Sequence, residues 1–292
     1  MNLIGAAHNF TLNHRSELSK DFFLLGDVRS IAFCVVAYLY MCFYGPRWMQ
    51  SRKEMHIKPI MQAYNILMIG INAYIGYELL STISGCNWLC EPGDFAVTPR
   101  NTRHARALWL YYISKIIEFI DTAFFIVRKK FTHVSFLHVY HHASMAVLMW
   151  TTTTFFPTGD TFGPVLFNVV IHIIMYNYYF FAALGPQYQK YLWWKKHLTK
   201  MQIVQFFLII HHSVSALYIN CNPDYNFIYY FLCFYMTSFV CLFLHFYIRS
   251  YIRGSNPKDA TTNNIDNKAT SSLANGSSKD SNVGSVHDKK QE

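Results

Sequence analysis

The chain has 292 residues, of which 52% are hydrophobic, 18% aromatic and only 14% charged. This composition excludes an ordinary soluble domain and is typical of a polytopic membrane protein. The formal charge of +9 does not indicate nucleic-acid binding, because the basic residues form short clusters between apolar runs instead of covering one face.

Residues 1–27 are polar and mixed, without the basic start, short apolar core and small-residue cleavage site of a signal peptide. We therefore expect the first apolar run to stay in the protein as a helix. The segment contains one N-glycosylation sequon, Asn9-Phe10-Thr11. Asn9 is thus a candidate glycosylation site if this end of the chain lies in a lumen.

Seven apolar runs follow, each close to the roughly 20 residues that a helix needs to cross a bilayer. They are residues 28–48, 59–83, 107–127, 134–155, 162–184, 201–219 and 227–248. An odd number of crossings puts the chain ends on opposite sides. Thirteen lysines and arginines lie in the loops on one side and six on the other. The positive-inside rule therefore predicts a lumenal N-terminus and a cytosolic C-terminus.

The third run, residues 107–127, carries Lys115, Glu118 and Asp121. Spacings of three and four residues stack these side chains on one helix face, where Lys115 can pair with Glu118. Ionisable groups inside a bilayer are costly and are functional candidates by default. A structural ion pair that locks this helix to its neighbours would explain Lys115 and Glu118 equally well, and the sequence leaves both interpretations open.

The fourth run, residues 134–155, contains His138, His141 and His142. Positions i, i+3 and i+4 share one helix face, so the three rings project together toward the neighbouring helices. Imidazole there can serve as a metal ligand, a general base or an acyl-accepting nucleophile. The histidine run alone does not choose among these roles.

Two more runs carry polar side chains at helical spacing: His172, Tyr176 and Tyr179 on the fifth, and Gln202 and Gln205 on the sixth. A rise of 1.5 Å per residue puts the carboxylates, histidines and glutamines within roughly 20 Å of the cytosolic surface. We expect a polar chamber that opens to the cytosol and closes toward the lumen. Such a chamber suits a substrate with a charged head and a long apolar tail.

The seven cysteines show no Cys-x-x-Cys spacing. Cys90 and Cys221 lie in two different loops that the charge pattern assigns to the oxidising lumenal side. A disulfide between them is therefore a candidate, and free thiols are the alternative.

Residues 253–292 are rich in Ser, Asn, Lys, Asp and Gly and hold hardly any apolar residue, so we expect a disordered cytosolic tail. The chain then divides into a lumenal segment 1–27, a seven-helix domain 28–252 and this tail. Lys289 and Lys290 stand third and fourth from the end. They resemble the dilysine signal that returns membrane proteins to the endoplasmic reticulum, and a solvated charge pair is the alternative.

Four motifs resemble those of the very-long-chain fatty acid elongases. Lys115-Ile-Ile-Glu118-Phe-Ile-Asp121-Thr122 is similar to the Lys-x-x-Glu-x-x-Asp-Thr box of that family, and His138-Val-Tyr-His141-His142 to its histidine box. His172-Ile-Ile-Met175-Tyr176-Asn177-Tyr178-Tyr179 is similar to His-x-x-Met-Tyr-x-Tyr-Tyr, and residues 199–205 to Thr-x-x-Gln-x-x-Gln. The resemblance extends from the first apolar run to the seventh.

The resemblance implies an all-α integral membrane fold of seven transmembrane helices. Six would form a barrel of two inverted three-helix units around a substrate tunnel, with the remaining helix outside. It also implies the condensing step of fatty acid elongation, in which acyl-CoA and malonyl-CoA give 3-ketoacyl-CoA, carbon dioxide and CoA. No cysteine is expected in the chamber to accept the acyl group, whereas imidazole can accept it. Our hypothesis is that His141 is the nucleophile, and that His138, His142 and His172 share proton transfer and carbonyl polarisation.

Basic residues at the cytosolic mouth could hold the phosphates of CoA, although the positive-inside effect explains them almost as well. They are Arg128, Lys129, Lys130, Lys195, Lys196 and Lys200. We expect acyl-CoA, malonyl-CoA and the bilayer as partners, with other enzymes of the elongation cycle and a second copy of the chain as further partners that the family implies. No cofactor, metal or nucleic acid is expected.

Two other protein classes share part of this pattern. A di-iron membrane desaturase or hydroxylase also has a His-x-x-His-His box, but two irons need about eight imidazoles, and no second box at metal-binding spacing is present. A seven-helix receptor would share the helix count and the external N-terminus. It would not explain why the histidines and the ionisable residues gather near the cytosolic side.

Overall fold

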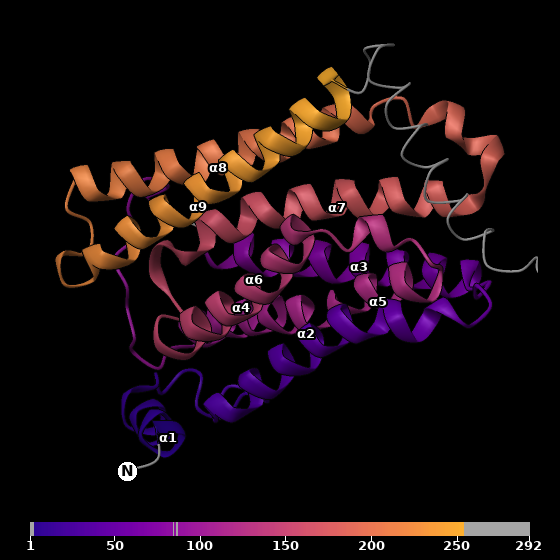
Figure 1. Ribbon diagram of the computed structural model, residues 1–292. Coiled ribbons are helices and arrows are strands. Elements are labelled where there is room, and N and C mark those ends of the chain that lie inside the picture. Colours follow the sequence, from indigo (N-terminus) through magenta and orange to yellow (C-terminus); the bar gives the residue numbers. More distant parts are fainter. Residues whose placement is uncertain (1–2, 84, 86, 254–292) are drawn as a thin grey trace, which may run out of the picture. The chain divides into compact units, whose positions relative to one another are not determined.

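Figure 1 shows the chain as a computed structural model, which describes residues 3–253 apart from residues 84 and 86. The described residues form helices joined by loops and contain no β-strand. The α-helices are α1 (Leu3–His14), α2 (Val28–Gln50), α3 (Lys58–Thr82), α4 (Pro99–Ile117), α5 (Phe119–Val127), α6 (Phe136–Phe155), α7 (Phe162–Leu184), α8 (Lys195–Tyr218) and α9 (Asn226–Tyr247). Shorter turns are η1 (Phe131–His133), η2 (Gly159–Thr161), η3 (Pro186–Tyr191), η4 (Pro223–Tyr225) and the π-helical η5 (Ile248–Ile252).

The chain divides into two compact units, Met1–Leu244 and His245–Glu292. All the contacts discussed below lie within the first unit. The predicted tail beyond residue 253, with Lys289 and Lys290, lies outside the described residues.

Four helical segments among the described residues are long and apolar enough to cross a membrane: Val28–Gln50, Gly159–Leu184, Lys195–Tyr218 and Pro223–Ile252. The three other predicted spans coincide with α3, with α4 and α5 together, and with α6. α4 carries a buried lysine and α6 carries three histidines. These polar residues line the interior of the bundle and lower the mean hydropathy of the two helices. The protein is therefore an all-helical, multi-pass membrane protein.

The surface of α2 indicates a lipid environment. Phe33, Val36 and Tyr40 are 75%, 65% and 64% exposed. A continuous apolar helix face of this kind is unfavourable in water, whereas hydrocarbon accepts apolar side chains once the helix has satisfied its own backbone. We infer that α2 faces lipid over much of its circumference.

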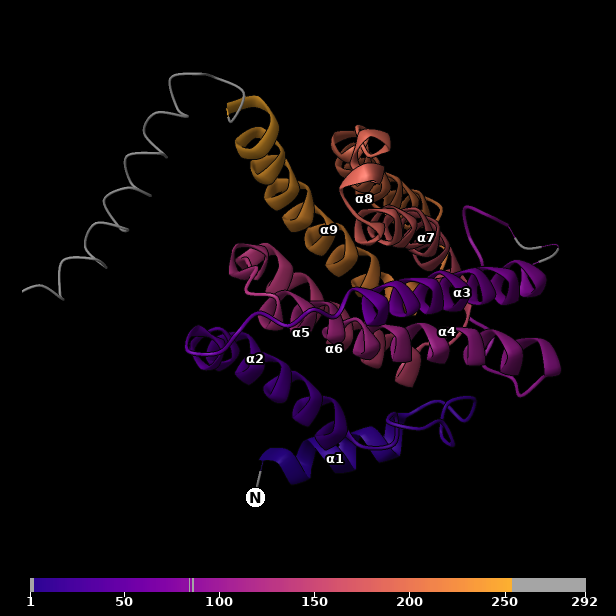
Figure 2. The same cartoon turned by 90° about the vertical axis from the view of Figure 1, so that its right-hand side faces the viewer.

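Each helix that carries site residues packs against particular neighbouring helices. α3 packs against both α4 and α7, α4 against α6, and α7 against α8, while α2 contacts α5 and α6 (Figure 2). α9 contacts α6 and α8 through side chains. The Tyr235 hydroxyl is hydrogen-bonded to Ser144 of α6 at 2.7 Å, and the Phe239 ring stacks on Phe206 of α8 with a centroid distance of 5.4 Å.

One predicted helix is divided in the structure. The sequence predicts a single helix over residues 107–127, but α4 ends at Ile117 and α5 begins at Phe119. The amide of Asp121 donates to the carbonyl of Glu118, three residues back. The Ile117 carbonyl instead accepts from the Tyr64 hydroxyl of α3, at 3.4 Å. This tightened turn places Glu118, whose exposed fraction is 0%, at the junction of two helices.

The N-terminal segment contains a helix that the sequence analysis does not predict. Asn9 is exposed on α1, whereas Thr11 of the same sequon is 2% exposed and its hydroxyl donates to the Ala7 carbonyl at 2.9 Å. Glycosylation of Asn9 stays a prediction.

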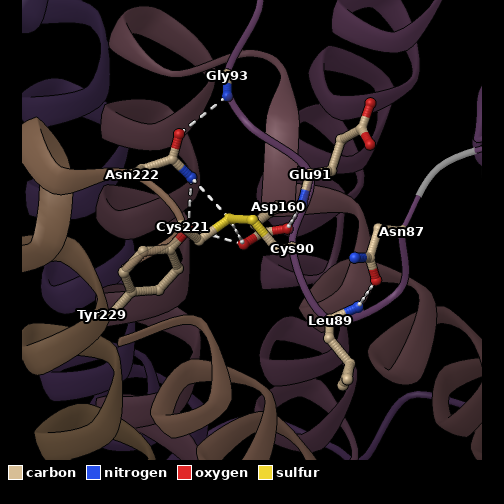
Figure 3. The surroundings of a disulfide bond; sticks show 9 residues. All are labelled: Asn87, Leu89, Cys90, Glu91, Gly93, Asp160, Cys221, Asn222 and Tyr229. Carbon is tan, nitrogen blue, oxygen red and sulfur yellow. Dashed lines mark hydrogen bonds between the residues drawn. A yellow bond between two sulfur atoms is a disulfide. The ribbon is translucent and has the colours of Figure 1, made fainter. Parts of the chain in front are cut away.

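Loops after α3 and after α8 are joined by a disulfide bond between Cys90 and Cys221 (Figure 3). These are the two cysteines that the sequence analysis pairs. The bond closes a separation of 131 residues and fixes both loops beside η2.

Asp160 of η2 is the centre of the hydrogen bonds around this disulfide. Its Oδ1 accepts from the Glu91 amide at 2.5 Å, and its Oδ2 accepts from the Tyr229 hydroxyl at 2.7 Å. Asn222 donates to the Tyr229 hydroxyl at 2.7 Å and accepts from the Gly93 amide at 3.0 Å. Figure 3 shows these groups around the disulfide, so the disulfide and the hydrogen bonds together close the gap between the loops after α3 and after α8.

The glycine before Asp160 gives a test of this closure. Gly159 has φ +70°, and a Cβ there would meet the Gly93 Cα at 2.9 Å. Gly159→Ala is therefore expected to lower the free energy of unfolding by about 1–3 kcal/mol, measured by thermal unfolding in detergent. Gly70→Ala is the control, because a Cβ on Gly70 of α3 meets nothing within 4 Å. Equal stability of the two variants would contradict the account.

Candidate active site

The three histidines of α6 lie close to one another, as their spacing predicts. Ser135 begins the helix by accepting a hydrogen bond from the His138 amide at 3.3 Å. The His142 ring lies 4.3 Å from His138 and 5.2 Å from His141, between ring centroids. The capping interaction thus fixes the turn that presents all three imidazoles.

His138 is held by a threonine on α5. Its Nε2 is hydrogen-bonded to the Thr122 hydroxyl at 2.7 Å, and the same hydroxyl is hydrogen-bonded to Tyr38 of α2 at 3.2 Å. α2 therefore supports the site although it contributes no residue to the four motifs.

Glu118 joins the first, second and third motifs. Its Oε1 accepts from Lys115 Nζ at 2.7 Å and lies 3.0 Å from His172 Nδ1. Its Oε2 lies 3.9 Å from His142 Nδ1 and makes no hydrogen bond with a described residue. Lys115 and Glu118 are 1% and 0% exposed, so this is a charge pair fully removed from solvent.

Two charged groups meet at Nδ1 of His172. Glu118 Oε1 lies 3.0 Å from this nitrogen and Lys115 Nζ lies 3.4 Å from it. A carboxylate accepts hydrogen bonds and an ammonium donates them, so the two contacts favour opposite tautomers of the neutral ring. In both tautomers the ring is held in place by the buried pair of Lys115 and Glu118.

Two residues of this network are absent from the sequence analysis. Asn168 Oδ1 accepts from the Tyr111 hydroxyl at 2.6 Å and from Lys115 Nζ at 3.2 Å. Each lies four residues before a motif residue, Tyr111 before Lys115 and Asn168 before His172. One helical turn upstream on the same face is the signal that could have identified both.

Asp121 of α5 belongs to a second group beside this network. Its Oδ2 accepts from the Tyr176 hydroxyl at 2.8 Å, and the Tyr176 ring packs against Tyr179 with a centroid distance of 6.1 Å. Tyr176 is 0% exposed. Tyr176 therefore connects Asp121 with the face of α7 that carries His172, whose ring lies 5.9 Å from the Tyr176 ring.

A cavity connects the histidine layer with the loop end. It is lined near the histidines by His141, Asn168 and Gln205, and no cysteine is among its described lining residues. The His141 ring makes no hydrogen bond with a described residue and touches the edge of Phe239, 5.4 Å between centroids. Gln202 lies to the side, with its Nε2 4.0 Å from Met175 Sδ.

The basic residues predicted at the mouth come from two segments. Partial desolvation of the ring lowers the pKa of His133 of η1, and the positive charges of Lys195, Lys130 and Arg128 lower it further. Arg128 also donates to Met61 Sδ of α3 at 3.4 Å. Lys129 instead donates to the Gln50 carbonyl at 3.0 Å, Lys196 is exposed, and Lys200 lines a groove along α7 and α8.

The site brings together side chains of the kind that acyl transfer requires. His141 presents an unbonded imidazole to a largely apolar cavity, and His138 and His172 are oriented by Thr122 and Glu118. Within the described residues, no group of three or more His, Cys, Asp and Glu side chains is arranged to hold a metal ion.

Comparison with known proteins gives one family. The model of the ELO family, described as the GNS1/SUR4 family, matches residues 23–259. A very long chain fatty acid elongase of Aedes aegypti is 38% identical over 237 residues, which are 79% of this chain and 65% of that protein. This chain thus spans just under two thirds of the mosquito relative.

Vertebrate relatives align over a similar region. Human very long chain fatty acid elongase 4 is 40% identical over 212 residues, covering 68% of each chain. Mouse very long chain fatty acid elongase 1 is 36% identical over 231 residues, covering 77% of this chain and 82% of its own length.

Proposed function

This chain belongs to the GNS1/SUR4 family of ELO proteins, and we propose that it is a fatty acid elongase that joins acyl-CoA with malonyl-CoA through an acyl group carried on His141. The reaction is that of a very-long-chain 3-oxoacyl-CoA synthase and needs no cofactor. The observation that carries the assignment of His141 is its unbonded ring at the wall of a cavity whose described lining contains no cysteine.

In the first proposed step, a ring nitrogen of His141 attacks the thioester carbonyl of acyl-CoA. A carbon–nitrogen bond forms, the carbon–sulfur bond breaks, and CoA leaves as the thiol after taking one proton from the site. The resulting acyl-imidazole is a reactive acyl donor. Neutral imidazole is required for the attack, and the apolar cavity around His141 favours that uncharged form.

In the second step, malonyl-CoA loses carbon dioxide and its C2 carbon attacks the acyl carbonyl. A carbon–carbon bond forms and the bond to His141 breaks. The departing imidazole takes up a proton from solvent, which replaces the one given to CoA, and 3-ketoacyl-CoA is released. His138, His142 and His172 are the groups we assign to proton transfer and to polarisation of the carbonyl oxygens. Glu118 supports two of them, because it contacts His172 and faces His142.

We also propose the barrel that the family resemblance implies. Its wall would be α3, α4 with α5, α6, α9, α8 and α7, and α2 would lie outside. The order of packed neighbours described above supports a closed ring of these helices. The N-terminal segment 1–27 would be lumenal, domain 28–252 would span the membrane of the endoplasmic reticulum, and the tail 253–292 would be cytosolic. A disulfide at the end assigned to the lumen supports this orientation.

The cytosolic mouth would bind the CoA phosphates through Lys130, Lys195 and Arg128, whose positive charges all act on His133. The double variant Lys130→Glu/Lys195→Glu is expected to raise the KM for both CoA substrates by roughly tenfold, with little change in kcat, because long-range charge attraction acts on binding. Steady-state kinetics at two salt concentrations measure this.

Lys20→Glu is the matched control, since Lys20 is an exposed lysine of the N-terminal segment. It reverses one charge without touching the mouth. An equal effect of both changes, or a KM effect that does not weaken in high salt, would assign these lysines to membrane orientation alone.

The activity itself is tested in membranes that contain the expressed protein. Labelled malonyl-CoA is supplied with a panel of saturated and unsaturated acyl-CoAs, and the 3-keto products are identified by mass spectrometry. Product with at least one acyl-CoA supports the proposal. No labelled product with any of them, from a folded protein, would overturn it.

A further inference from the structure

The cavity that begins at His141 has a second polar end. Along α8 it is lined by Gln205, Phe206 and Ile209 and finally His212, and along α6 it continues from His141 to Phe156. Fifteen residues of helix correspond to about 20 Å. The cavity then ends against Thr158 and Asp160. If this end of the cavity only received the terminal methyl group of an acyl chain, apolar side chains would be sufficient there.

His212 is the most unusual group at this end. It is 7% exposed, and neither ring nitrogen makes a hydrogen bond with a described residue. The Asp160 carboxylate acts on the ring through its charge, and the Trp88 backbone lies beside the ring. A buried ring nitrogen without a well-formed hydrogen bond costs about 1–3 kcal/mol, so a polar group at this end of the cavity would stabilise the ring.

Thr158 provides a second unused group at the same end. It is 6% exposed and its hydroxyl has no hydrogen-bond partner among the described residues. Asp160, Asn222 and Tyr229 also line the cavity, but they are bonded to one another and to the loop after α3 (Figure 3). The unsatisfied groups are therefore the two that line the cavity without belonging to this closed network.

The position of the His212 ring is fixed by its surroundings. A Cβ on Gly163 of α7 would lie 3.0 Å from His212 Nε2, so the glycine gives the ring its space. The disulfide and the bonds around Asp160 hold the facing loops. The polar end is thus a built site about 20 Å along the cavity from His141, a depth that the far end of a long chain reaches.

We propose that this end binds the terminal hydroxyl of an ω-hydroxylated acyl chain, so that the enzyme elongates ω-hydroxyacyl-CoA. The inference rests on the proposed function, because it takes His141 as the point where the acyl carbonyl is held. A hydroxyl both donates and accepts, which matches a neutral imidazole beside the Thr158 hydroxyl. A terminal carboxylate is disfavoured, because Asp160 already supplies a negative charge there.

The test compares kcat/KM for ω-hydroxyacyl-CoA, methyl-terminated acyl-CoA and ω-carboxyacyl-CoA over a series of chain lengths. In the wild-type protein, the ratio of hydroxy to methyl substrate is expected to reach roughly tenfold at the length that spans the cavity. Shorter chains should show no preference, and ω-carboxy chains should be poor at every length. If the ratio of kcat/KM for the hydroxy and methyl substrates does not change with chain length, the proposal is overturned. The polar end would then bind buried water and no part of the substrate.

Variants then locate the effect. His212→Phe and, independently, Thr158→Val are expected to remove the preference for the hydroxy chain while keeping elongation of methyl-terminated chains. His211→Phe is the control, because His211 is exposed and contacts only Ser215 of its own helix. Equal losses for both substrate types would assign His212 and Thr158 to folding and overturn the binding role. No product with any substrate would instead contradict the proposed function itself.

Discussion

Replacing His141 by alanine is expected to lower the rate of 3-ketoacyl-CoA formation by about 10³-fold or more, the scale seen when a covalent nucleophile is removed. Stability should change little, because the His141 ring makes no hydrogen bond with a described residue and only one of its edges packs on Phe239. The measurement is the condensation assay on purified protein, with thermal unfolding of the same sample.

The covalent step is tested separately from the overall reaction. Wild-type protein incubated with acyl-CoA alone should release CoA and gain the mass of one acyl group, and His141→Ala should do neither. His211→Ala, an exposed histidine on α8, is the control. An acyl adduct on His141→Ala, or near-normal condensation by this variant when His138→Ala and His172→Ala are inactive, would show that another histidine is the nucleophile.

The second large effect is expected at the buried pair of Lys115 and Glu118. Glu118→Gln leaves the Lys115 ammonium inside the bundle without its counter-charge, and breaking such a pair costs about 3–5 kcal/mol. Asn168 then remains as an uncharged acceptor for Lys115. We expect a clearly lower midpoint of thermal unfolding in detergent and loss of activity.

A double variant distinguishes a structural role of this pair from a catalytic one. Lys115→Met/Glu118→Met removes both charges and is expected to regain much of the lost stability. Activity should stay lost, because Glu118 orients His172 at 3.0 Å and faces His142. A stable and active double variant would make the pair a structural lock only, the alternative that the sequence leaves open.

Much of the site follows from helical periodicity. The spacing of His138, His141 and His142 predicts one shared face. In the structure the centroid of the His142 ring lies 4.3 Å from that of His138 and 5.2 Å from that of His141. The i, i+3 spacing of Lys115 and Glu118 predicts their contact, which is present at 2.7 Å. Such local geometry depends only on the rise and turn of the helix, so it is contained in the sequence.

Contacts between helices were predicted less well. Glu118 meets His172 across 54 positions of sequence, and Asp121 is bonded to Tyr176 of another helix; helical spacing specifies neither contact. The break at Glu118 was missed, because the run of residues 107–127 has no proline or glycine to signal it. At the break, the Tyr64 hydroxyl of α3 donates a hydrogen bond to the Ile117 carbonyl in place of a backbone amide of the same helix.

The sequence by itself determined the membrane class, the approximate positions of the apolar helices and the four motifs, because composition, periodicity and spacing are local properties. Only the tertiary structure decided which partner each polar group has. Asn168 and Tyr111 complete the Lys115 network, and His212 and Thr158 form a second polar end of the cavity. The reason is physical: a hydrogen bond or an unsatisfied nitrogen inside a bundle depends on the rotation and depth of neighbouring helices, which no single segment specifies.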